Sequence, residues 1–519
     1  MDLEKSRSFL FLPMRLEGSD PEWPSKGEFG MHQRILRTSF CAALAFAGLL
    51  LGCGGGDSRA LAPFTRLAYF SGDLTSVASV RYTIEPKAGS VSSPVDVRYS
   101  HSALERRGCL NSASGELALP IFGLYANYQN RVLVQFQFQD GSTQTLPVFI
   151  TTSPYTAPDA LYDHPNILKK RSANSVLGFD FLYIKSGLGS PVVIDTDGEI
   201  RWVGWGVTDA TSSRFQENAF WIGDSRSATL KRLELDGSHT LFQIGPSTFT
   251  NFHHNIDPGK LGMLAEFDAT SSGVAKRGST VAELGNEGTV LKEWDLAALL
   301  GSYMKSQGDD PSSFIRPGTD WFHMNSSMYD PSDDSLVVSS RENFVIKLDY
   351  QTGSVVWILG DPTKYWYTFP SLRAKALTLE AGGLYPLGQH ALSMTADGQL
   401  ILFNNGACSF NQPTGAPVGE VRDYSAVSAY AVDPMARTAR EVWRFDYGQS
   451  ILSSICSSAY EASDKSLLVN YAVASDWTKA RLVGLDAGHS VIFDFEYPTT
   501  PCVTSWNAEP IPFDNLAFE

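Results

Sequence analysis

Residues 320–360 read DWFHMNSSMYDPSDDSLVVSSRENFVIKLDYQTGSVVWILG, and this segment carries the local pattern that decides the fold. Short apolar runs alternate with turns rich in Asp, Ser and Gly. Short strands joined by such turns are typical of an antiparallel sheet. The segment therefore predicts three neighbouring strands of one sheet, at 336–339, 344–348 and 354–359.

The second half of this segment recurs along the chain as a strand, a turn centred on Asp or Gly, and a strand that often bears Trp or Phe. Copies lie at 191–205, 231–244, 279–294, 345–359, 429–445 and 481–495. Each follows an earlier strand pair, so each repeat can supply about four strands. The repetition predicts a six-bladed β-propeller with insertions in several blades. A row of repeated sandwich domains is the competing interpretation.

Composition supports an all-β protein and excludes one class of partner. The 519 residues include 44 Gly and 27 Pro, and 12% are aromatic, as in chains built from many short strands. The net charge of −15 argues against nucleic-acid binding, which needs a basic face.

The start of the chain looks like an export signal. Residues 33–53 read QRILRTSFCAALAFAGLLLGC, with a basic start, a short apolar core and a lipobox-like end at Cys53. Because the apolar run is short for a membrane span, a cleaved signal is favoured over an anchor helix. We expect lipidation of Cys53 and a periplasmic or cell-envelope lipoprotein. A soluble N-terminal extension is the alternative.

We expect five regions in all. They are 1–30, an upstream extension from a start codon assigned too early; 31–53, the lipoprotein-type signal peptide; 54–75, a tether; 76–153, a small N-terminal β-sandwich; and 160–519, the propeller. After export, Cys109, Cys408, Cys456 and Cys502 are left in an oxidising compartment. Three disulfide connectivities are open, and the wide spacing does not resemble a zinc site.

Three of the nine histidines occupy matching positions in the repeats. NFHHNID (251–257) and WFHMNSS (321–327) share Phe-His-x-Asn, and GQHALS (388–393) places a histidine in the same phase. The innermost strands of a propeller line its central channel, where residues distant in sequence meet. The candidate site residues are therefore His253, Asn255, Phe322, His323, Asn325 and His390.

Two further residues adjoin this set. Arg341 lies eighteen residues after His323 on an adjoining strand, so it returns to the same end of the blade. His254 is expected to point away from the site, although it can exchange roles with His253.

With these motifs in view, the chain resembles the bacterial aryl-sulfate sulfotransferases that use no nucleotide sulfate donor. The resemblance rests on DWFHMNSSMYDPSDDSLVVSSRENFVIKLDYQTGSVVWILGDP, on GQHALSM and on GLYANYQNRVLVQF. It implies that His390 is the nucleophile and becomes a sulfohistidine, and that His253 is a second channel histidine, suited to act as acid and base. Arg341, His323 and Asn325 would hold the sulfuryl oxygens.

The resemblance also implies a ping-pong reaction between a small aryl sulfate donor and a phenolic acceptor. No cofactor is expected, because the site needs no metal and the chain has no Gly-rich phosphate loop. A homodimer is left open.

Two other classes compete. A metal-dependent propeller hydrolase would use His253, His323 and His390 as ligands, although it would also need carboxylates in the channel. A non-catalytic scaffold similar to quinoprotein-like propellers is suggested by LDYQTGSVVWILGD, but a scaffold has no use for histidines in phase.

Overall fold

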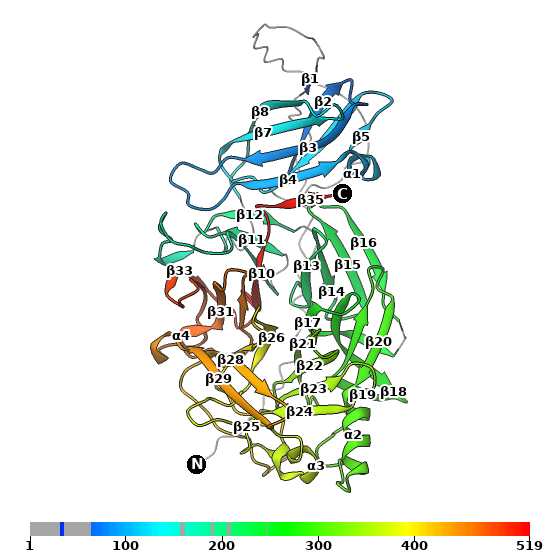
Figure 1. Ribbon diagram of the computed structural model, residues 1–519, viewed down its shortest axis with the longest axis vertical. Coiled ribbons are helices and arrows are strands. Elements are labelled where there is room, and N and C mark those ends of the chain that lie inside the picture. Colours follow the sequence, from blue (N-terminus) through cyan, green and yellow to red (C-terminus); the bar gives the residue numbers. More distant parts are fainter. Residues whose placement is uncertain are drawn as a thin grey trace, which may run out of the picture.

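The computed structural model describes residues 32–35, 64–155, 161–163, 165–187, 191–204, 209–245 and 248–519. Strands dominate, with a small domain at one end of an elongated molecule and a larger assembly of sheets at the other (Figure 1). The predicted all-β class, a β-propeller preceded by a small β-domain, is confirmed. The extension 1–30 and Cys53 lie outside the described residues, as does the predicted signal peptide apart from 32–35.

The N-terminal domain contains two sheets that share one core. The first has the order β1 (His32–Ile35), β2 (Arg66–Gly72), β6 (Glu116–Ile121), β5 (Leu110–Asn111). The second has the order β35 (Leu516–Phe518), β4 (Val95–Ser100), β3 (Val77–Ile84), β7 (Gln129–Phe138), β8 (Thr143–Thr151). Along β7 the side chains alternate between solvent and core, and Val132, Val134 and Phe136 are fully buried. This alternation is what a sandwich strand requires.

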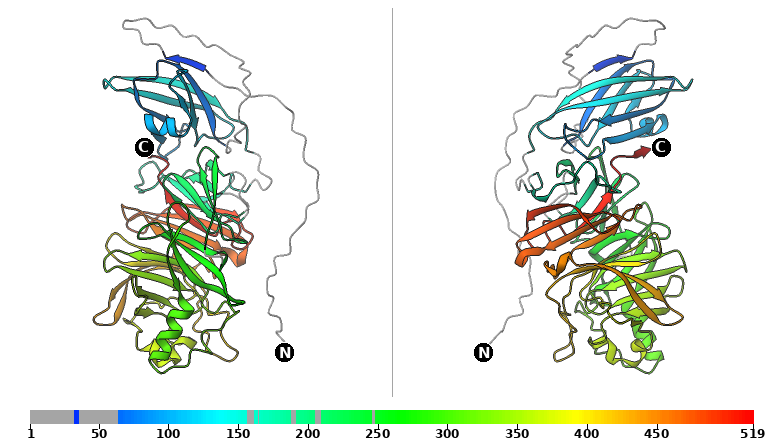
Figure 2. Two further views of the ribbon diagram at one scale, coloured as in Figure 1. Left: turned by 90° about the vertical axis from the view of Figure 1, so that its right-hand side faces the viewer. Right: turned by 60° about the vertical axis from the view of Figure 1, so that its left-hand side comes forward.

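Two strands of this domain differ from the sequence prediction. The tether predicted at 54–75 contains β2, which pairs with β6 and buries Phe70. The C-terminal strand β35 leaves the propeller and pairs in parallel with β4, so it crosses from one domain to the other (Figure 2). The ring of Phe518 stacks on Tyr99 at 4.6 Å between centroids. A strand this short is stabilised by its partner, so its own sequence carries little signal.

Between residues 166 and 511, the described chain forms six sheets of four or five strands. The first three are β12 (Ile200–Val203), β11 (Val192–Asp195), β10 (Phe181–Lys185), β34 (Asn507–Ile511); β13 (Ser213–Gln216), β14 (Ala219–Gly223), β15 (Thr229–Glu234), β16 (His239–Gln243); and β17 (Phe249–Pro258), β18 (Met263–Ser271), β19 (Val274–Leu284), β20 (Val290–Asp295). The others are β21 (Met324–Asp330), β22 (Ser335–Ser340), β23 (Val345–Asp349), β24 (Val355–Leu359); β25 (Thr378–Leu379), β29 (Thr438–Phe445), β28 (Ala426–Asp433), β27 (Leu400–Asn404), β26 (His390–Met394); and β30 (Ser458–Glu461), β31 (Leu467–Val473), β32 (Lys479–Leu485), β33 (Val491–Pro498), β9 (Asn166–Lys169).

The predicted repeats coincide with the later strand pairs of these sheets. They correspond to β11–β12, β15–β16, β19–β20, β23–β24, β28–β29 and β32–β33. Strands from the two ends of the propeller segment complete the first and last sheets, since β34 pairs with β10 and β9 pairs with β33. This pairing closes the propeller and protects edges that would otherwise be exposed.

The innermost strands of three consecutive sheets, β17, β21 and β26, lie next to one another. Each has a shift in pairing register, between Phe252 and Ile256, between Met324 and Ser326, and between His390 and Ser393. Such β-bulges redirect side chains and are frequent beside functional sites. The bulges fall on the segments whose histidines were predicted to share a phase.

The part of the chain that the structure describes has few helices, all of them short. They are α1 (His101–Arg106), α2 (Leu296–Ser306), α3 (Pro370–Arg373) and α4 (Ala474–Trp477), with 3₁₀ turns at Tyr365–Thr368 and Tyr447–Gln449. α2 begins where the side chain of Asp295 accepts a hydrogen bond from the backbone of Ala298. Its buried Leu296, Leu300 and Met304 recur every four residues and face the core. Among the described residues, no helix has the length and hydropathy needed to cross a bilayer.

One disulfide occurs in the described part of the chain, between Cys456 and Cys502. The sequence left three pairings open, and the fold selects this one by bringing the start of the sixth sheet against the loop before β34. Cys109 lies in the N-terminal domain, and Cys408 lies in the loop between β27 and β28.

Candidate active site

Three histidines meet where β17 and β21 lie side by side. Nε2 of His254, on β17, lies 3.0 Å from Nε2 of His323, which immediately precedes β21. His253 packs against both, with ring centroids 4.4 Å from His254 and 5.5 Å from His323. The predicted convergence of His253 and His323 is therefore present.

The expectation that His254 points away from the site is wrong. Neighbouring side chains alternate between the two faces of a regular strand. The bulge between Phe252 and Ile256 interrupts that alternation, so His253 and His254 both contact His323. His254 also stacks on Trp506, at 4.8 Å between ring centroids, and lies 6.5 Å from the ring of His390.

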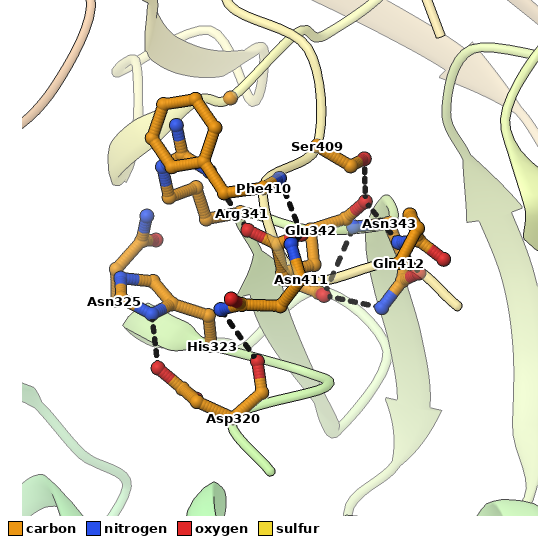
Figure 3. A network of polar contacts seen from close by, with 12 residues as sticks. Asp320, His323, Asn325, Arg341, Glu342, Asn343, Ser409, Phe410, Asn411 and Gln412 are labelled. Atoms are coloured by element: carbon orange, nitrogen blue, oxygen red, sulfur yellow. Dashed lines mark hydrogen bonds and ion pairs between the residues drawn. The ribbon is translucent and has the colours of Figure 1, made fainter. Parts of the chain in front are cut away.

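Carboxylates hold two of these imidazoles. Asp268 Oδ1 lies 2.9 Å from Nδ1 of His253, and Asp320 contacts Nδ1 of His323 (Figure 3). Burial alone would lower the pKa of His253, but its hydrogen bond to Asp268 and the nearby Asp320 raise that pKa to about 9. Burial and the neighbouring positive groups hold the pKa of His254 well below its ordinary value.

His390 lies at the start of β26 and is almost completely buried. Its Nδ1 lies 2.8 Å from Oδ1 of Asn405 and 3.0 Å from the backbone oxygen of Gly388. Because both partners are acceptors, Nδ1 carries the proton and Nε2 keeps a lone pair. Burial lowers the pKa of His390 to about 3, although the contact with Asn405 opposes this shift, so the imidazole is neutral near pH 7.

The side-chain amide of Asn405 is fixed in turn. Its Nδ2 donates to the backbone oxygens of Ser453, at 2.6 Å, and Cys456, at 3.0 Å. The Cys456–Cys502 disulfide therefore anchors the loop that orients Asn405.

Arg341 is buried beside the histidines. Its backbone N–H donates to the carbonyl of His323 at 3.0 Å, so the two residues share one end of the blade, as predicted. Nη1 donates to Oε1 of Glu342 at 2.8 Å, and the ring of Phe410 lies 3.5 Å from the centre of the guanidinium (Figure 3). Nη2 is buried and has no hydrogen-bond partner among the described residues. It is therefore available to an anionic ligand.

Glu342 links this arginine to the loop between β27 and β28. Its Oε2 accepts hydrogen bonds from the backbone N–H groups of Phe410, at 2.8 Å, and Asn411, at 2.7 Å (Figure 3). One buried carboxylate thus fixes the guanidinium on one side and the covering loop on the other. Phe410 itself is 59% exposed, so its ring forms part of the outer surface next to Arg341.

The two predicted asparagines differ in whether their side chains are available to the site. Asn325 is buried at the site, where Nδ2 donates to the backbone oxygen of Gln389 at 2.7 Å and Oδ1 lacks a partner in the described chain. In this orientation it offers the site an acceptor. Asn255 is committed to Lys185 and Asp257, each at 2.7 Å, and does not offer a free amide oxygen as Asn325 does.

Phe322 was expected to contact substrate, but its side chain is completely buried. It packs in the core against Trp321 and Phe344, at 5.3 Å and 6.1 Å between ring centroids. This Phe of the Phe-His-x-Asn motif has a structural role, because it packs in the core and so holds the start of β21 in place.

Six residues at the site were not predicted from the sequence: Asp268, Asp320, Asn405, Glu342, Phe410 and Trp506. Asp320 and Glu342 adjoin predicted residues in sequence, and their acidity was a usable signal. Trp506 carries no such signal, because ring closure and the disulfide bring it to the site. Asn405 carries none either, and it reaches His390 because it directly follows β27, which pairs with β26.

The site offers a neutral imidazole, a hydrogen-bonded imidazole pair and a buried guanidinium, which together suit transfer of an anionic group. Among the described residues, the group of side chains with metal-ligand potential is His253, His254 and His323, whose ligand atoms lie within 4.8 Å of one another. The sequence-based hydrolase alternative included His390 and omitted His254.

Comparisons with known proteins agree with this chemistry. The sequence profile described as arylsulfotransferase (ASST) matches residues 169–502, and that of the arylsulfotransferase Ig-like domain matches residues 60–154. Arylsulfate sulfotransferase AssT of Escherichia coli O6:H1 (strain CFT073) is 26% identical over 274 residues, which cover 47% of this chain and 45% of that protein. AssT of Lelliottia amnigena is 21% identical over 346 residues, covering 54% and 56% respectively.

The matched region thus spans about half the length of these curated relatives. Among solved structures, the β-propeller domain of Cps50 (Swd1) from Myceliophteria thermophila superposes with a TM-score of 0.33 at 12% identity. That superposition covers 65% of this chain and 97% of that one, and the similarity is too low to support an argument.

Proposed function

Because the chain belongs to the arylsulfotransferase (ASST) family, we propose that it transfers a sulfuryl group from an aryl sulfate to a phenol through a covalent adduct on His390. The observation that carries the proposal is the fixed tautomer of His390. Two acceptors hold its Nδ1–H, and Nε2 keeps a lone pair on a buried imidazole that lies near a guanidinium and further imidazoles.

In the first half-reaction, Nε2 of His390 forms a bond to sulfur while the bond from sulfur to the aryl oxygen breaks. The electron pair of that bond leaves with the phenolate oxygen. The ring then carries a positive charge, which the Nδ1–H shares with Oδ1 of Asn405 and the oxygen of Gly388. These contacts strengthen as the charge develops, so they favour the transition state.

The departing phenolate needs a proton when the phenol is weakly acidic. The family resemblance suggested His253 for this role. We assign it to the hydrogen-bonded pair His254–His323, because His254 adjoins His390 and shares a short Nε2–Nε2 contact with His323. His253, held by Asp268, lies behind the pair.

Arg341 holds the sulfuryl oxygens. Its Nη2 has no hydrogen-bond partner in the described chain, while Glu342 and Phe410 fix the orientation of the guanidinium. A charge-assisted hydrogen bond from this group stabilises the negative oxygens through both half-reactions.

In the second half-reaction, the hydroxyl oxygen of an acceptor phenol attacks sulfur and gives its proton to the imidazole pair. The bond between sulfur and Nε2 breaks, and its electron pair restores neutral His390. Because donor and acceptor use the same pocket in turn, the kinetics are ping-pong.

The location of the enzyme is a separate proposal. The basic and apolar segment that ends at Cys53 supports export and lipid attachment at that residue, which would place the enzyme in the periplasm or cell envelope. Mass spectrometry of the native N-terminus tests this, and a native chain that begins at an unmodified Met1 would contradict it.

The activity test uses 4-nitrophenyl sulfate as donor and phenol as acceptor, in the presence of a chelator, and follows release of nitrophenolate. Wild-type enzyme should turn over, and His390→Ala should fall to background. His489→Ala is the matched control, because His489 packs against Trp443 in an outer part of the propeller. Near wild-type turnover by His390→Ala would overturn the covalent mechanism.

A further inference from the structure

The three-histidine cluster has the dimensions of a metal site. His253, His254 and His323 each contribute one ligand atom to a group that spans no more than 4.8 Å. The Nε2 atoms of His254 and His323 are 3.0 Å apart. Two nitrogen ligands of a tetrahedral zinc ion are separated by about 3.3 Å. This pair would therefore move only slightly to share an ion.

The outer nitrogens of two of these imidazoles are already occupied. Asp268 binds Nδ1 of His253, and Asp320 binds Nδ1 of His323, so the Nε2 atoms are the ones left for a ligand. Nε2 of His253 is buried, with no hydrogen-bond partner in the described chain. A carboxylate on the outer nitrogen is the usual second shell of a metal-binding histidine, because it fixes the tautomer and raises ligand basicity.

The donor set selects the class of ion. Three imidazole nitrogens suit Zn²⁺, Cu²⁺, Ni²⁺ and Co²⁺, whereas Mg²⁺ and Ca²⁺ prefer oxygen. The carboxylates of Asp268 and Asp320 contribute negative charge next to the cluster, and the guanidinium of Arg341 opposes it from one side.

We propose that His253, His254 and His323 form a binding site for one divalent transition-metal ion of the Zn²⁺ class, and that the bound ion inhibits sulfuryl transfer. Binding follows from the cluster itself. Inhibition rests on the proposed function, because an ion on Nε2 of His254 and His323 removes the nitrogens that carry the exchanged proton.

His390 is not a ligand in this proposal. Its Nδ1 is committed to Asn405 and Gly388, and its ring centroid lies 6.5 Å from that of His254. It therefore serves as a matched control, being a buried histidine of the same pocket outside the ligand set.

Binding is tested with the full chain, free of any polyhistidine tag, by titration with Co²⁺. The d–d absorption of Co²⁺ reports its coordination, and Zn²⁺ should displace it with a stoichiometry of about one per chain. His254→Ala and His323→Ala should lose the absorption band, and His390→Ala should keep it. Asp268→Asn keeps all three ligands and should weaken binding by about 10- to 100-fold, the usual effect of losing a second-shell carboxylate.

Circular dichroism shows that each variant is folded before titration. Absence of saturable Co²⁺ binding by folded wild-type protein would overturn the proposal. Equal loss of binding in His390→Ala would also overturn it, because it would place His390 among the ligands as in the hydrolase alternative.

Inhibition is tested separately with 4-nitrophenyl sulfate. Zn²⁺ should stop turnover at the concentration that fills the site, and a chelator should restore it. If one ion binds but turnover is unchanged, the inhibitory part of the proposal fails. If a chelator abolishes turnover and Zn²⁺ restores it, the inhibitory part and the metal-free mechanism both fail. If no form of the enzyme turns over aryl sulfates, the proposed function fails, whereas the Co²⁺ spectrum still decides the site.

Discussion

Asn405→Ala isolates the contact that orients the proposed nucleophile. Nδ1 of His390 donates to Oδ1 of Asn405 at 2.8 Å and to the backbone oxygen of Gly388 at 3.0 Å. The substitution removes the first acceptor and keeps the second, so the tautomer protonated at Nδ1 is less strongly favoured but still forms. One net hydrogen bond contributes about 0.5–1.5 kcal/mol. At about 1.4 kcal/mol per factor of ten, kcat/KM should fall by about 2- to 12-fold.

The loss should be the same for good and poor leaving groups, because the substitution acts on the nucleophile. The assay is steady-state kcat/KM with 4-nitrophenyl sulfate and with an unactivated phenyl sulfate. Asn404→Ala is the matched control, since Asn404 is a neighbouring buried amide that bonds the backbones of Leu387 and Tyr385 and the side chains of Arg422 and Tyr430. Both variants should unfold at a lower temperature than wild type. Only Asn405→Ala should be less active at temperatures well below its unfolding transition. Equal losses of activity in both variants would show that Asn405 does not orient the nucleophile.

The remaining predictions concern the acid, the anion site, the disulfide and pH. His254→Ala should slow transfer from unactivated phenyl sulfates by about 10²–10⁴ and from 4-nitrophenyl sulfate far less, because only the poorer leaving group needs a proton; a rate series over substituted phenols measures this, and a uniform loss contradicts it. Arg341→Ala should lower kcat by about 10²–10³ for every donor, and intact turnover would remove the arginine from the anion site. Reduction of the Cys456–Cys502 disulfide should cost about 2–4 kcal/mol of stability in denaturant unfolding and should slow turnover; unchanged kinetics after verified reduction would show that the loop holds without it. The burst of nitrophenolate should stay constant from about pH 5 to pH 8, because burial lowers the pKa of His390 to about 3 and the imidazole stays neutral above that value; stopped-flow traces that lose amplitude with a midpoint near the ordinary histidine pKa would contradict this.

The sequence was sufficient for the architecture because local patterns determine it. Each outer hairpin combines apolar strands with an Asp or Gly turn, and Gly353 after β23 has a φ of 71° that favours glycine. The C-terminal strand β35 could not be found in this way. It has three residues, and its pairing with β4 is a contact between the two ends of the chain.

Some residues of the site could be predicted from the sequence, again because a local repeated pattern determines their positions. His253, His323 and His390 repeat in phase because equivalent blades place equivalent residues at the channel. The position of Arg341 could be predicted because the length of one hairpin returns it to the same end of the blade as His323. The orientation of His254 depends on a bulge, which has no reliable signature in a single sequence. Trp506 reaches His254 from far along the chain, through a segment that the disulfide anchors.

In the proposed mechanism, His390 carries the sulfuryl group between the two half-reactions. The most direct test mixes enzyme with an aryl sulfate donor and no acceptor, quenches rapidly under alkaline conditions, and maps the modified peptide by mass spectrometry. We expect one sulfuryl group on His390, lost on adding phenol and absent in His390→Ala. A sulfuryl group on His253, His254 or His323, or an unmodified enzyme that still turns over, would contradict it.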